Sequence, residues 1–256
     1  MGKKAIGIDI GGTGIKGAVV NLKSGELVGD RIRVETPPGG SPKDIASTVA
    51  QIIAQLPDVK DSYEVGICFP AVVQHGVTKS AANVSKDWIG LDADALFTKA
   101  LGRSVHVIND ADAAGVAEIK FGAGKNFAGL VFMSTLGTGI GTALFIDGKL
   151  VPNAELGHLE IEGVDYETRA SFAAKEREEL DWDEWSGRLQ KYFSTVERLF
   201  SPDLIIVGGG VSKEHENFLP NLKLKTKIVP AQKRNNAGIL GAAALAHKNR
   251  RDKESK

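Results

Sequence analysis

The segment AIGIDIGGTGIKGAVV, residues 5–20, decides the fold of this chain. Its two apolar runs, 5–10 and 15–20, flank the glycine-rich turn GGTG, and the second run ends at the turn KSGE. This pattern predicts a β-hairpin, followed by a third strand near 27–34. Successive glycines in such a turn let several backbone N–H groups point at one anion, because no Cβ atoms stand in the way. The segment therefore predicts a sheet whose first turn binds phosphate.

The same unit occurs a second time. Residues 137–145, GTGIGTALF, align with residues 12–20, GTGIKGAVV, and the turns that follow end in GKLV (148–151) and GELV (25–28). Chance similarity between two glycine-rich hairpins is the alternative, but the shared Gly-Thr-Gly-Ile and the second matching turn favour duplication. A repeat of this kind indicates two similar α/β halves around a cleft.

The rest of the chain alternates strand and helix signals. Strands are expected at 64–69, 105–108, 129–134, 140–146, 203–210 and near 226–229. Helices are expected after Ser41-Pro42, near 92–101, within 167–200 and over 236–248. In the first of these, apolar residues recur at helical spacing, at Ile45, Val49, Ile52, Ile53 and Leu56. We expect two α/β domains, residues 1–108 with 236–256 and residues 109–235, with the last helix returning to the first domain.

The composition of the 256 residues is that of a globular protein, with 42% hydrophobic and 25% charged residues. The formal net charge is zero, which argues against a nucleic-acid partner, since proteins that bind nucleic acid show a basic excess. The start MGKKAIGIDIGG lacks the apolar core of a signal peptide, and no apolar stretch reaches the roughly 18 residues of a membrane span. These features predict a cytoplasmic protein with no membrane partner.

The single cysteine, Cys68, has no second thiol with which to form an internal disulfide. One thiol is also too few for a multi-thiolate zinc site. Because Cys68 lies in the apolar run VGICFP, we expect a buried, unreactive side chain.

Three glycine-rich turns are candidates for binding a phosphate donor. The residues concerned are Gly11, Gly12, Thr13, Gly14, Lys16, Gly137, Thr138, Gly139, Gly209 and Gly210. The threonine hydroxyls add hydrogen-bond donors, and Lys16 adds a positive charge. The P-loop pattern is absent, and the first turn leads into a strand, which excludes a Rossmann fingerprint. Three purely structural turns are the alternative interpretation.

Two aspartates stand at strand ends. Asp9 precedes the first glycines, and its carboxylate could face phosphate oxygens only with Mg²⁺, directly or through water, between them; a turn-capping aspartate is the alternative. Asp110, preceded by Asn109, follows the strand 105–108 and opens a helix. A carboxylate at the carboxyl end of a strand suits a general base that accepts the proton of an attacking hydroxyl. Asp110 would serve equally well as a helix N-cap, and local sequence leaves both roles open.

Glu155 and His158 lie three residues apart in NAELGHLE, and Glu167 lies further along. Carboxylates and imidazoles suit sugar hydroxyls, because each accepts or donates a hydrogen bond in a defined direction. Glu-x-x-His also occurs at metal sites, but the thiols that would complete such a site are missing. A structural histidine is the other interpretation of His158.

Five motifs occur in the order of one known family. DIGGTGIKG, NDADAAG, STLGTGIG, ELGH and IIVGGG, spread over residues 5–245, resemble the ROK family (repressors, open reading frames and sugar kinases). The resemblance implies the actin-like ATPase (ribonuclease H-like) fold, with two α/β domains flanking a cleft, and a sugar kinase with Asp110 as general base. Carried over position by position, the sugar ligands are Asn83, Asn109, Asp110, Glu155, His158 and Glu167. The turns at 11–14 and 137–139 then bind phosphate, and Gly208 to Gly210 line the nucleotide side.

The chain differs from most family members in one motif, and this difference points to one subgroup. Most family members follow the Glu-x-Gly-His motif with a cysteine-rich zinc site, whereas no cysteine follows here, so no zinc is predicted and the role of Glu167 depends on spacing alone. The missing zinc site and the segment AANVSKDWIG resemble the polyphosphate glucokinase subgroup of the family. This resemblance implies phosphoryl transfer from polyphosphate, with ATP as a second donor, to the 6-hydroxyl of glucose. It also implies Mg²⁺ and a homodimer, for which Trp182, Trp185, Tyr192 and Phe193 form either the interface or a core.

Three other functions are weighed against this one. An ATP-only hexokinase for glucose, mannose or another hexose is the alternative in the same class. A non-catalytic sugar-sensing repressor would carry a helix-turn-helix ahead of the first strand, where only residues 1–4 stand. An actin-like structural ATPase would leave Glu155, His158 and Glu167 without a purpose.

A polyphosphate donor needs cations that lead to the site. Lys213, Lys223, Lys225, Lys227, Lys233 and Arg234 follow the third glycine turn, and Lys86 lies near the expected sugar loop. The first six cluster in the sequence, as a cationic track for polyphosphate would require. The alternation in LKLKTK is also typical of a solvated edge strand, and charge alone favours that interpretation. Only the resemblance to the subgroup favours polyphosphate as the donor.

Overall fold

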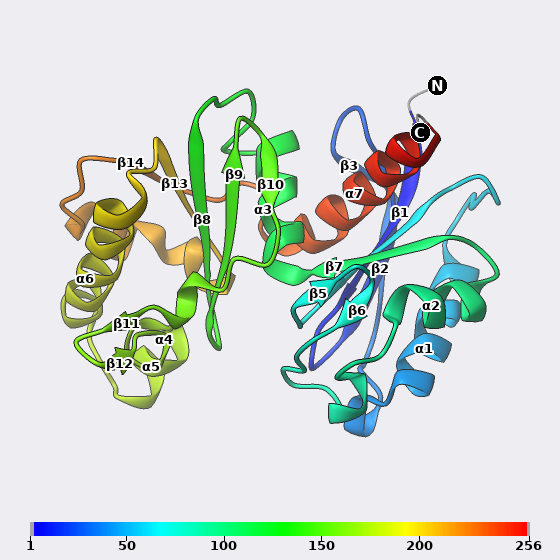
Figure 1. The fold of residues 1–256 in the computed structure, drawn as a ribbon, viewed down its shortest axis with the longest axis horizontal. Coiled ribbons are helices and arrows are strands. Elements are labelled where there is room, and N and C mark those ends of the chain that lie inside the picture. Colours follow the sequence, from blue (N-terminus) through cyan, green and yellow to red (C-terminus); the bar gives the residue numbers. More distant parts are fainter. Residues whose placement is uncertain (1–2, 255–256) are drawn as a thin grey trace. The chain divides into compact units, whose positions relative to one another are not determined.

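The computed structural model describes residues 3–254, which belong to two compact units (Figure 1). Unit 1 comprises Met1–Ala117 and Asn236–Lys256, and unit 2 comprises Glu118–Asn235. The sequence predicts a boundary after residue 108, whereas the contacts divide the chain after Ala117. The reason is that the first turns of the helix after residue 109 pack in unit 1, where Ala113 joins an apolar cluster with Cys68 and Ala242. The functional limits of the two domains stay a prediction.

Unit 1 is built on a five-stranded sheet with the order β3-β2-β1-β4-β7. Its strands are β1 (Lys4–Ile10), β2 (Ile15–Asn21), β3 (Glu26–Val34), β4 (Val65–Phe69) and β7 (Val105–Asn109). A small hairpin, β5 (Val73–Gln74) with β6 (Val77–Thr78), follows β4. β1, β2 and β3 are antiparallel neighbours, whereas β1, β4 and β7 run parallel. The predicted hairpin and third strand are confirmed.

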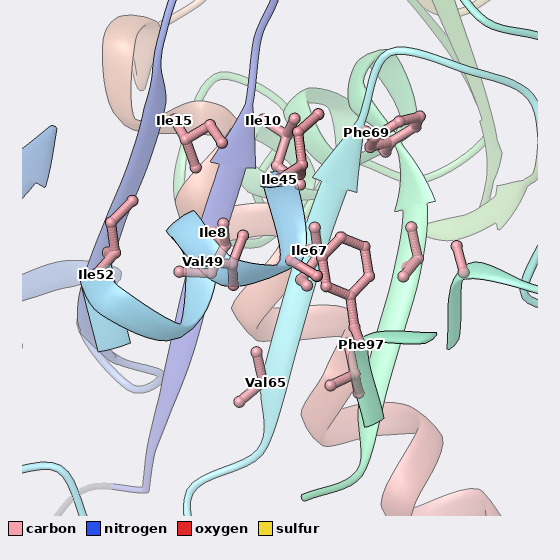
Figure 2. Packing of buried hydrophobic residues seen from close by; sticks show 14 of the residues in the cluster. Ile8, Ile10, Ile15, Ile45, Val49, Ile52, Val65, Ile67, Phe69 and Phe97 are labelled. Atoms are coloured by element: carbon pink, nitrogen blue, oxygen red, sulfur yellow. The ribbon is translucent and has the colours of Figure 1, made fainter. Parts of the chain in front are cut away.

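The helices of unit 1 are α1 (Pro42–Gln55), α2 (Ala93–Leu101), α3 (Asp110–Phe121, which extends into unit 2) and α7 (Ala237–Glu254). Helix α1 begins where the sequence predicts, because the hydroxyl of Ser41 accepts a hydrogen bond from the Asp44 amide at 3.3 Å. Its apolar residues lie one helical turn apart and point to the sheet, as Figure 2 shows for Ile45 and Val49 against Ile8 and Ile67. These four side chains are fully buried, so α1 closes the core of this face.

Helix α7 packs on β1 and β4 without intervening side chains. A Cβ atom on Gly7 or Gly66 would overlap the carbonyl group of Ile239 or Ala242 in this helix. Only glycine permits such a close approach of backbones. The contact brings the start of α7 to the end of β1, where a Cβ atom on Gly238 would lie 3.1 Å from Cγ of Asp9.

Unit 2 repeats the plan with the strand order β10-β9-β8-β13-β14. Its strands are β8 (Leu130–Leu136), β9 (Ile140–Ile146), β10 (Lys149–Val151), β13 (Leu204–Gly208) and β14 (Lys227–Pro230), with a small pair, β11 (Glu160–Ile161) and β12 (Val164–Asp165). Its helices after α3 are α4 (Glu167–Ala170), α5 (Phe172–Arg177) and α6 (Trp182–Phe200). Strand by strand, the two sheets have the same order, and β2 and β9 both follow a glycine turn. The internal repeat therefore extends to the whole of each sheet.

The aromatic residues of α6 belong to the core of unit 2. Trp185, Tyr192 and Phe193 are fully buried, and the Trp185 indole lies against Phe218 with 5.0 Å between ring centroids. Trp182, which is partly buried, stacks on the same phenylalanine. Of the two interpretations of these residues, core packing is thus the one that the structure supports.

No helix within residues 3–254 has both the length and the apolar composition that crossing a membrane requires.

Candidate active site

The first glycine turn joins β1 to β2 and is closed by a hydrogen bond from the Gly11 amide to the Gly14 carbonyl, 3.1 Å. Gly12 and Thr13 are exposed. Asn83, a predicted sugar ligand, lies directly against this turn, since a Cβ atom on Gly12 would be 2.9 Å from the Asn83 Cβ. Asn83 itself adopts a left-handed backbone with φ of 60°, a conformation that asparagine tolerates better than most residues. Asn83, a candidate sugar ligand, thus lies next to the first glycine turn, a candidate phosphate-binding turn.

Asp9 is the last but one residue of β1, next to this turn, and has two partners. Lys16 on β2 donates to its Oδ2 at 3.1 Å, and the Cys68 thiol on β4 donates to its Oδ1 at 3.2 Å. Cys68 is fully buried, as the sequence predicts, and burial raises the pKa of its thiol well above the usual value, with the charges of Asp9 and Asp110 adding to the effect. The thiol therefore stays protonated and holds one oxygen of the Asp9 carboxylate in place.

The residues around Asp9 fit a Mg²⁺ ion that is bound chiefly by water and by phosphate oxygens of the phosphoryl donor. The Asp9 side chain is 21% exposed at the rim of the glycine turn, and Asp110 lies close enough to act on the same thiol. Magnesium in phosphoryl-transfer sites typically uses one or two carboxylates together with phosphate oxygens and waters. A closed cage of three or more His, Cys, Asp or Glu side chains does not occur among the described residues. Phosphate oxygens of the substrate and water molecules would therefore complete the coordination shell of an ion held by Asp9.

Asn109 and Asp110, at the start of α3, make different contacts. The side-chain oxygen of Asn109 accepts from the Asp112 amide at 3.0 Å, and its amide donates to the Ala71 carbonyl at 3.1 Å. Asn109 is therefore the residue that caps the helix, and it is buried. Asp110 is exposed at the carboxyl end of β7, with Oδ1 accepting from the Ala111 amide at 2.8 Å. This geometry leaves a carboxylate at the surface of unit 1, at the carboxyl end of β7.

The second glycine turn, between β8 and β9, is bound to Glu167. The Gly137 amide donates to the Gly139 carbonyl at 3.0 Å, and Thr138 is exposed as Thr13 is in the first turn. Glu167 Oε2 accepts from the Ile140 amide at 2.6 Å, directly after the turn. A Cβ atom on Gly139 would overlap Oε2 of Glu167, so any larger residue there would displace this carboxylate. Glu167, a candidate sugar ligand, is thus bound to the second glycine turn, a candidate phosphate-binding turn.

The third glycine motif lies against the second. Gly209 has φ of 85°, and a Cβ atom there would overlap the backbone of Leu136 at the end of β8. The parallel register of β8 and β13 pairs Thr135 with Gly208, which places both motifs at the same end of the sheet. In unit 2, therefore, the second and third glycine motifs form one surface.

His158 and Glu155 form the remaining polar group of unit 2. His158 Nδ1 lies 2.9 Å from Asp165 Oδ2, and this hydrogen bond raises the pKa of the imidazole, with contributions from the charges of Glu167, Asp165 and Glu155. Burial raises the pKa of Glu155, a shift that the charge of His158 opposes and the charge of Glu167 supports. The charges of Glu155, His158 and Glu167 thus influence one another. Asp165 binds Nδ1 of His158, so Nε2 takes no part in that hydrogen bond.

We expect the pKa of His158 to lie above its ordinary value of 6.5 and to fall when Asp165 is replaced by asparagine. The pair stabilises the folded state fully below pH 6.5, and this contribution is lost as the pH rises through the raised pKa. Titration of the histidine resonances by NMR in the wild type and in Asp165→Asn measures the change. The exposed His75 of unit 1 is the internal reference, and a His158 midpoint that is the same in both proteins would contradict the assignment.

Comparisons with known proteins show the family to which the chain belongs. The profile of the ROK family matches residues 5–176. The chain belongs to the ROK family. A polyphosphate glucokinase from Mycobacterium tuberculosis (strain CDC 1551 / Oshkosh) is 43% identical over 242 residues, 94% of this chain and 90% of the relative.

Solved structures show the same ROK architecture. The inorganic polyphosphate/ATP-glucomannokinase from Arthrobacter sp. strain KM matches with a TM-score of 0.90 and 57% identity, over 96% of this chain and 99% of that one. A ROK family glucokinase from Streptomyces griseus, solved in complex with glucose and AMPPNP, matches with a TM-score of 0.82 and 25% identity, over 96% of this chain and 100% of that one. The fold is thus the two-domain actin-like ATPase fold that the motifs predict.

The basic residues of this ROK chain do not form the single cluster that the sequence suggests. Register pairs Lys227 with Leu204, at the start of β13, whereas Pro230 pairs with Val207 near its end. Lys223, Lys225 and Lys227 are exposed at the end of the sheet away from the glycine motifs. Lys233 and Arg234 follow β14 and lie at the glycine end, as does Lys213 after Gly210. The LKLKTK run is not an edge strand either, because only its last residue, Lys227, belongs to β14, and residues 222–226 form an irregular segment in which Leu222 is buried. Its three lysines are solvated, as the edge-strand interpretation requires, but they precede the strand.

Three polar residues of the site escape prediction from the sequence. They are Cys68 as a donor to Asp9, Asp165 as the partner of His158, and Arg33 beside the first glycine turn. Cys68 and Asp165 carry no pattern that marks them, because each acts through a contact across separate elements. Arg33 carries a weak signal, since it alternates with Arg31 on a predicted strand next to the phosphate turn.

Proposed function

We propose that this chain is a sugar kinase that transfers a phosphoryl group from inorganic polyphosphate, and also from ATP, to the 6-hydroxyl of glucose. The observation that carries the proposal is the similarity, over nearly the full length of both chains, to an enzyme named as a polyphosphate/ATP-glucomannokinase. The mycobacterial polyphosphate glucokinases support the same donor. The glycine turns and the carboxylates described above are the groups that such a reaction needs.

In the proposed reaction Asp110 is the general base. The 6-hydroxyl oxygen of glucose attacks the terminal phosphorus of the donor, the bond from that phosphorus to the bridging oxygen breaks, and the hydroxyl proton passes to the Asp110 carboxylate. The shortened donor leaves with the bridging oxygen. Asp110 suits this role because it is exposed while Asn109 carries the capping bond of α3.

The other predicted residues bind and orient the two substrates. Donor oxygens accept hydrogen bonds from the turns at 11–14 and 137–139, from Thr13 and Thr138, and from Lys16, with Gly209 and Gly210 lining the donor side. Glucose hydroxyls are assigned to Asn83, Asn109, Glu155, His158 and Glu167. Because Glu167 also holds the Ile140 amide, sugar binding and the second phosphate turn share one side chain.

The proposal further includes Mg²⁺, a cytoplasmic location and a homodimer, all of which stay predictions. Asp9 is the residue that would hold the ion. When bound, Mg²⁺ offsets charge on the donor phosphates and on the group in transfer. The Lys16 and Cys68 contacts hold the Asp9 carboxylate in place near the end of β1 without any ion.

The first experiment compares the two donors. Formation of glucose 6-phosphate is measured with glucose and Mg²⁺ at matched concentrations of terminal phosphate in polyphosphate and in ATP. We expect turnover with both donors and faster turnover with polyphosphate. Activity with ATP alone would leave the alternative of an ATP-dependent hexokinase, and no activity with either donor on glucose, mannose or fructose would contradict the kinase assignment.

A further inference from the structure

A row of charged side chains crosses the sheet of unit 1 beside the first glycine turn. Register places Asp9 of β1 opposite Lys16 of β2, and Lys16 opposite Arg33 of β3. Directly opposed residues of antiparallel strands have Cα atoms roughly 5 Å apart and side chains on the same face. The row therefore leads from Asp9 outward to β3, the edge strand of this sheet.

The guanidinium of Arg33 lies over the glycine turn. A Cβ atom on Gly14 would be 2.9 Å from Nε and 3.0 Å from Nη2 of Arg33, so glycine leaves the room that this side chain occupies. Nη2 also donates to the Thr13 carbonyl at 3.5 Å. The Arg33 guanidinium thus lies against the backbone of the 11–14 turn, which is proposed to bind the donor phosphates.

Arg33 supplies the positive charge that the rest of the row lacks. Lys16 is paired with Asp9 at 3.1 Å, so those two charges largely offset each other. Arg31, the previous arginine of β3, donates to the side chain of Asn236 at 3.2 Å. Arg33 is exposed, and no carboxylate among the described side chains pairs with it. Among the described residues its guanidinium has one hydrogen bond, to the Thr13 carbonyl, so most of its N–H groups are available to a ligand.

We propose that Arg33 binds a donor phosphate beyond the one that is transferred, so that the Lys16–Arg33 row receives the polyphosphate chain as it leaves the first glycine turn. The inference rests on the proposed function and adds a subsite to it. A planar guanidinium suits this task because it donates two parallel hydrogen bonds to the oxygens of one phosphate. The exposed lysines of the LKLKTK run lie at the far end of the other sheet from its glycine motifs. The row, by contrast, adjoins a donor turn directly.

The test compares Arg33→Ala, Arg33→Lys and Lys99→Ala with the wild type. Lys99 is an exposed cation on α2 and is the matched control for loss of one charge in the same unit. Binding of polyphosphate of defined chain length is measured by calorimetry without glucose, at several salt concentrations, so that no transfer occurs. Thermal unfolding and glucose binding report the integrity of each variant.

We expect Arg33→Ala to weaken polyphosphate binding about tenfold or more, as loss of a charge-assisted hydrogen bond predicts. The slope of log K against log salt should become shallower by about one, because one phosphate contact is lost. Arg33→Lys should recover part of the affinity, and Lys99→Ala should bind as the wild type does.

Two outcomes would overturn the inference, and they differ in what they say of the function. If the wild type turns over polyphosphate and Arg33→Ala binds it as tightly as Lys99→Ala does, the subsite is wrong and the polyphosphate kinase stands. If the wild type neither binds nor uses polyphosphate but is active with ATP, the proposed donor fails and the subsite fails with it.

Discussion

Replacing Asp110 with asparagine should lower the rate of glucose phosphorylation by about three orders of magnitude or more while leaving the fold and glucose binding intact. Asparagine keeps the size of the side chain but does not accept the hydroxyl proton. The exposed position of Asp110 and the cap supplied by Asn109 mean that α3 still begins at the same residue. Single-turnover measurements with saturating donor, together with glucose calorimetry, separate the chemical step from binding.

Asp58→Asn is the matched control for this variant. Asp58 is exposed in unit 1 and has φ of 53°, a conformation that asparagine also adopts readily. It should retain wild-type activity. If purified Asp110→Asn phosphorylates glucose at a rate within tenfold of the wild type, Asp110 is not the general base.

The second large effect is expected at Glu167. Glu167→Ala removes the carboxylate that accepts from the Ile140 amide after the second glycine turn and, under the proposed function, a bond to a glucose hydroxyl. Each charge-assisted bond contributes roughly tenfold or more, so we expect kcat/KM to fall about a hundredfold or more. Both the KM for glucose and the KM for the donor should rise, since the side chain serves both.

Glu167→Gln separates the two roles of this residue. The glutamine side-chain oxygen still accepts from the Ile140 amide, so the turn should keep its shape and the KM for the donor should change less than in Glu167→Ala. Glu176→Ala, at an exposed position of α5, is the control for loss of a surface carboxylate in unit 2. A rise in the KM for glucose alone in Glu167→Ala would contradict the link between Glu167 and the phosphate turn.

Much of the fold was predictable because local signals agree with the tertiary structure. The glycine turns end β1 and β8 where the apolar runs stop, and the spacing of Ile45, Val49 and Ile52 marks the buried face of α1. The repeat at 12–20 and 137–145 reflects two sheets with the same strand order. Such agreement between local preference and final packing is what lets a sequence specify one fold.

The site was only partly predictable for a different reason. Asp9 and Asp110 stand at strand ends, where topology alone indicates chemistry. The contact of Glu167 with the Ile140 amide joins residues far apart in the chain, and nothing in the local sequence of either residue indicates it. The same holds for Cys68, which the sequence predicts as buried but not as a donor to Asp9.

The sequence by itself determined the family, the order of the elements and the three glycine motifs, because each depends on neighbouring residues whose backbone preferences are local. Only the tertiary structure decided which side chains meet across strands. An irregularity between Gly17 and Val19 shifts the pairing of β2 with β3, so that Lys16 faces Arg33. A hairpin register counted from the turn, where Asn21 faces Glu26, would have placed Arg31 there instead. A bulge inserts residues into one strand only, and the resulting register follows from how the strands pack, which no local pattern determines.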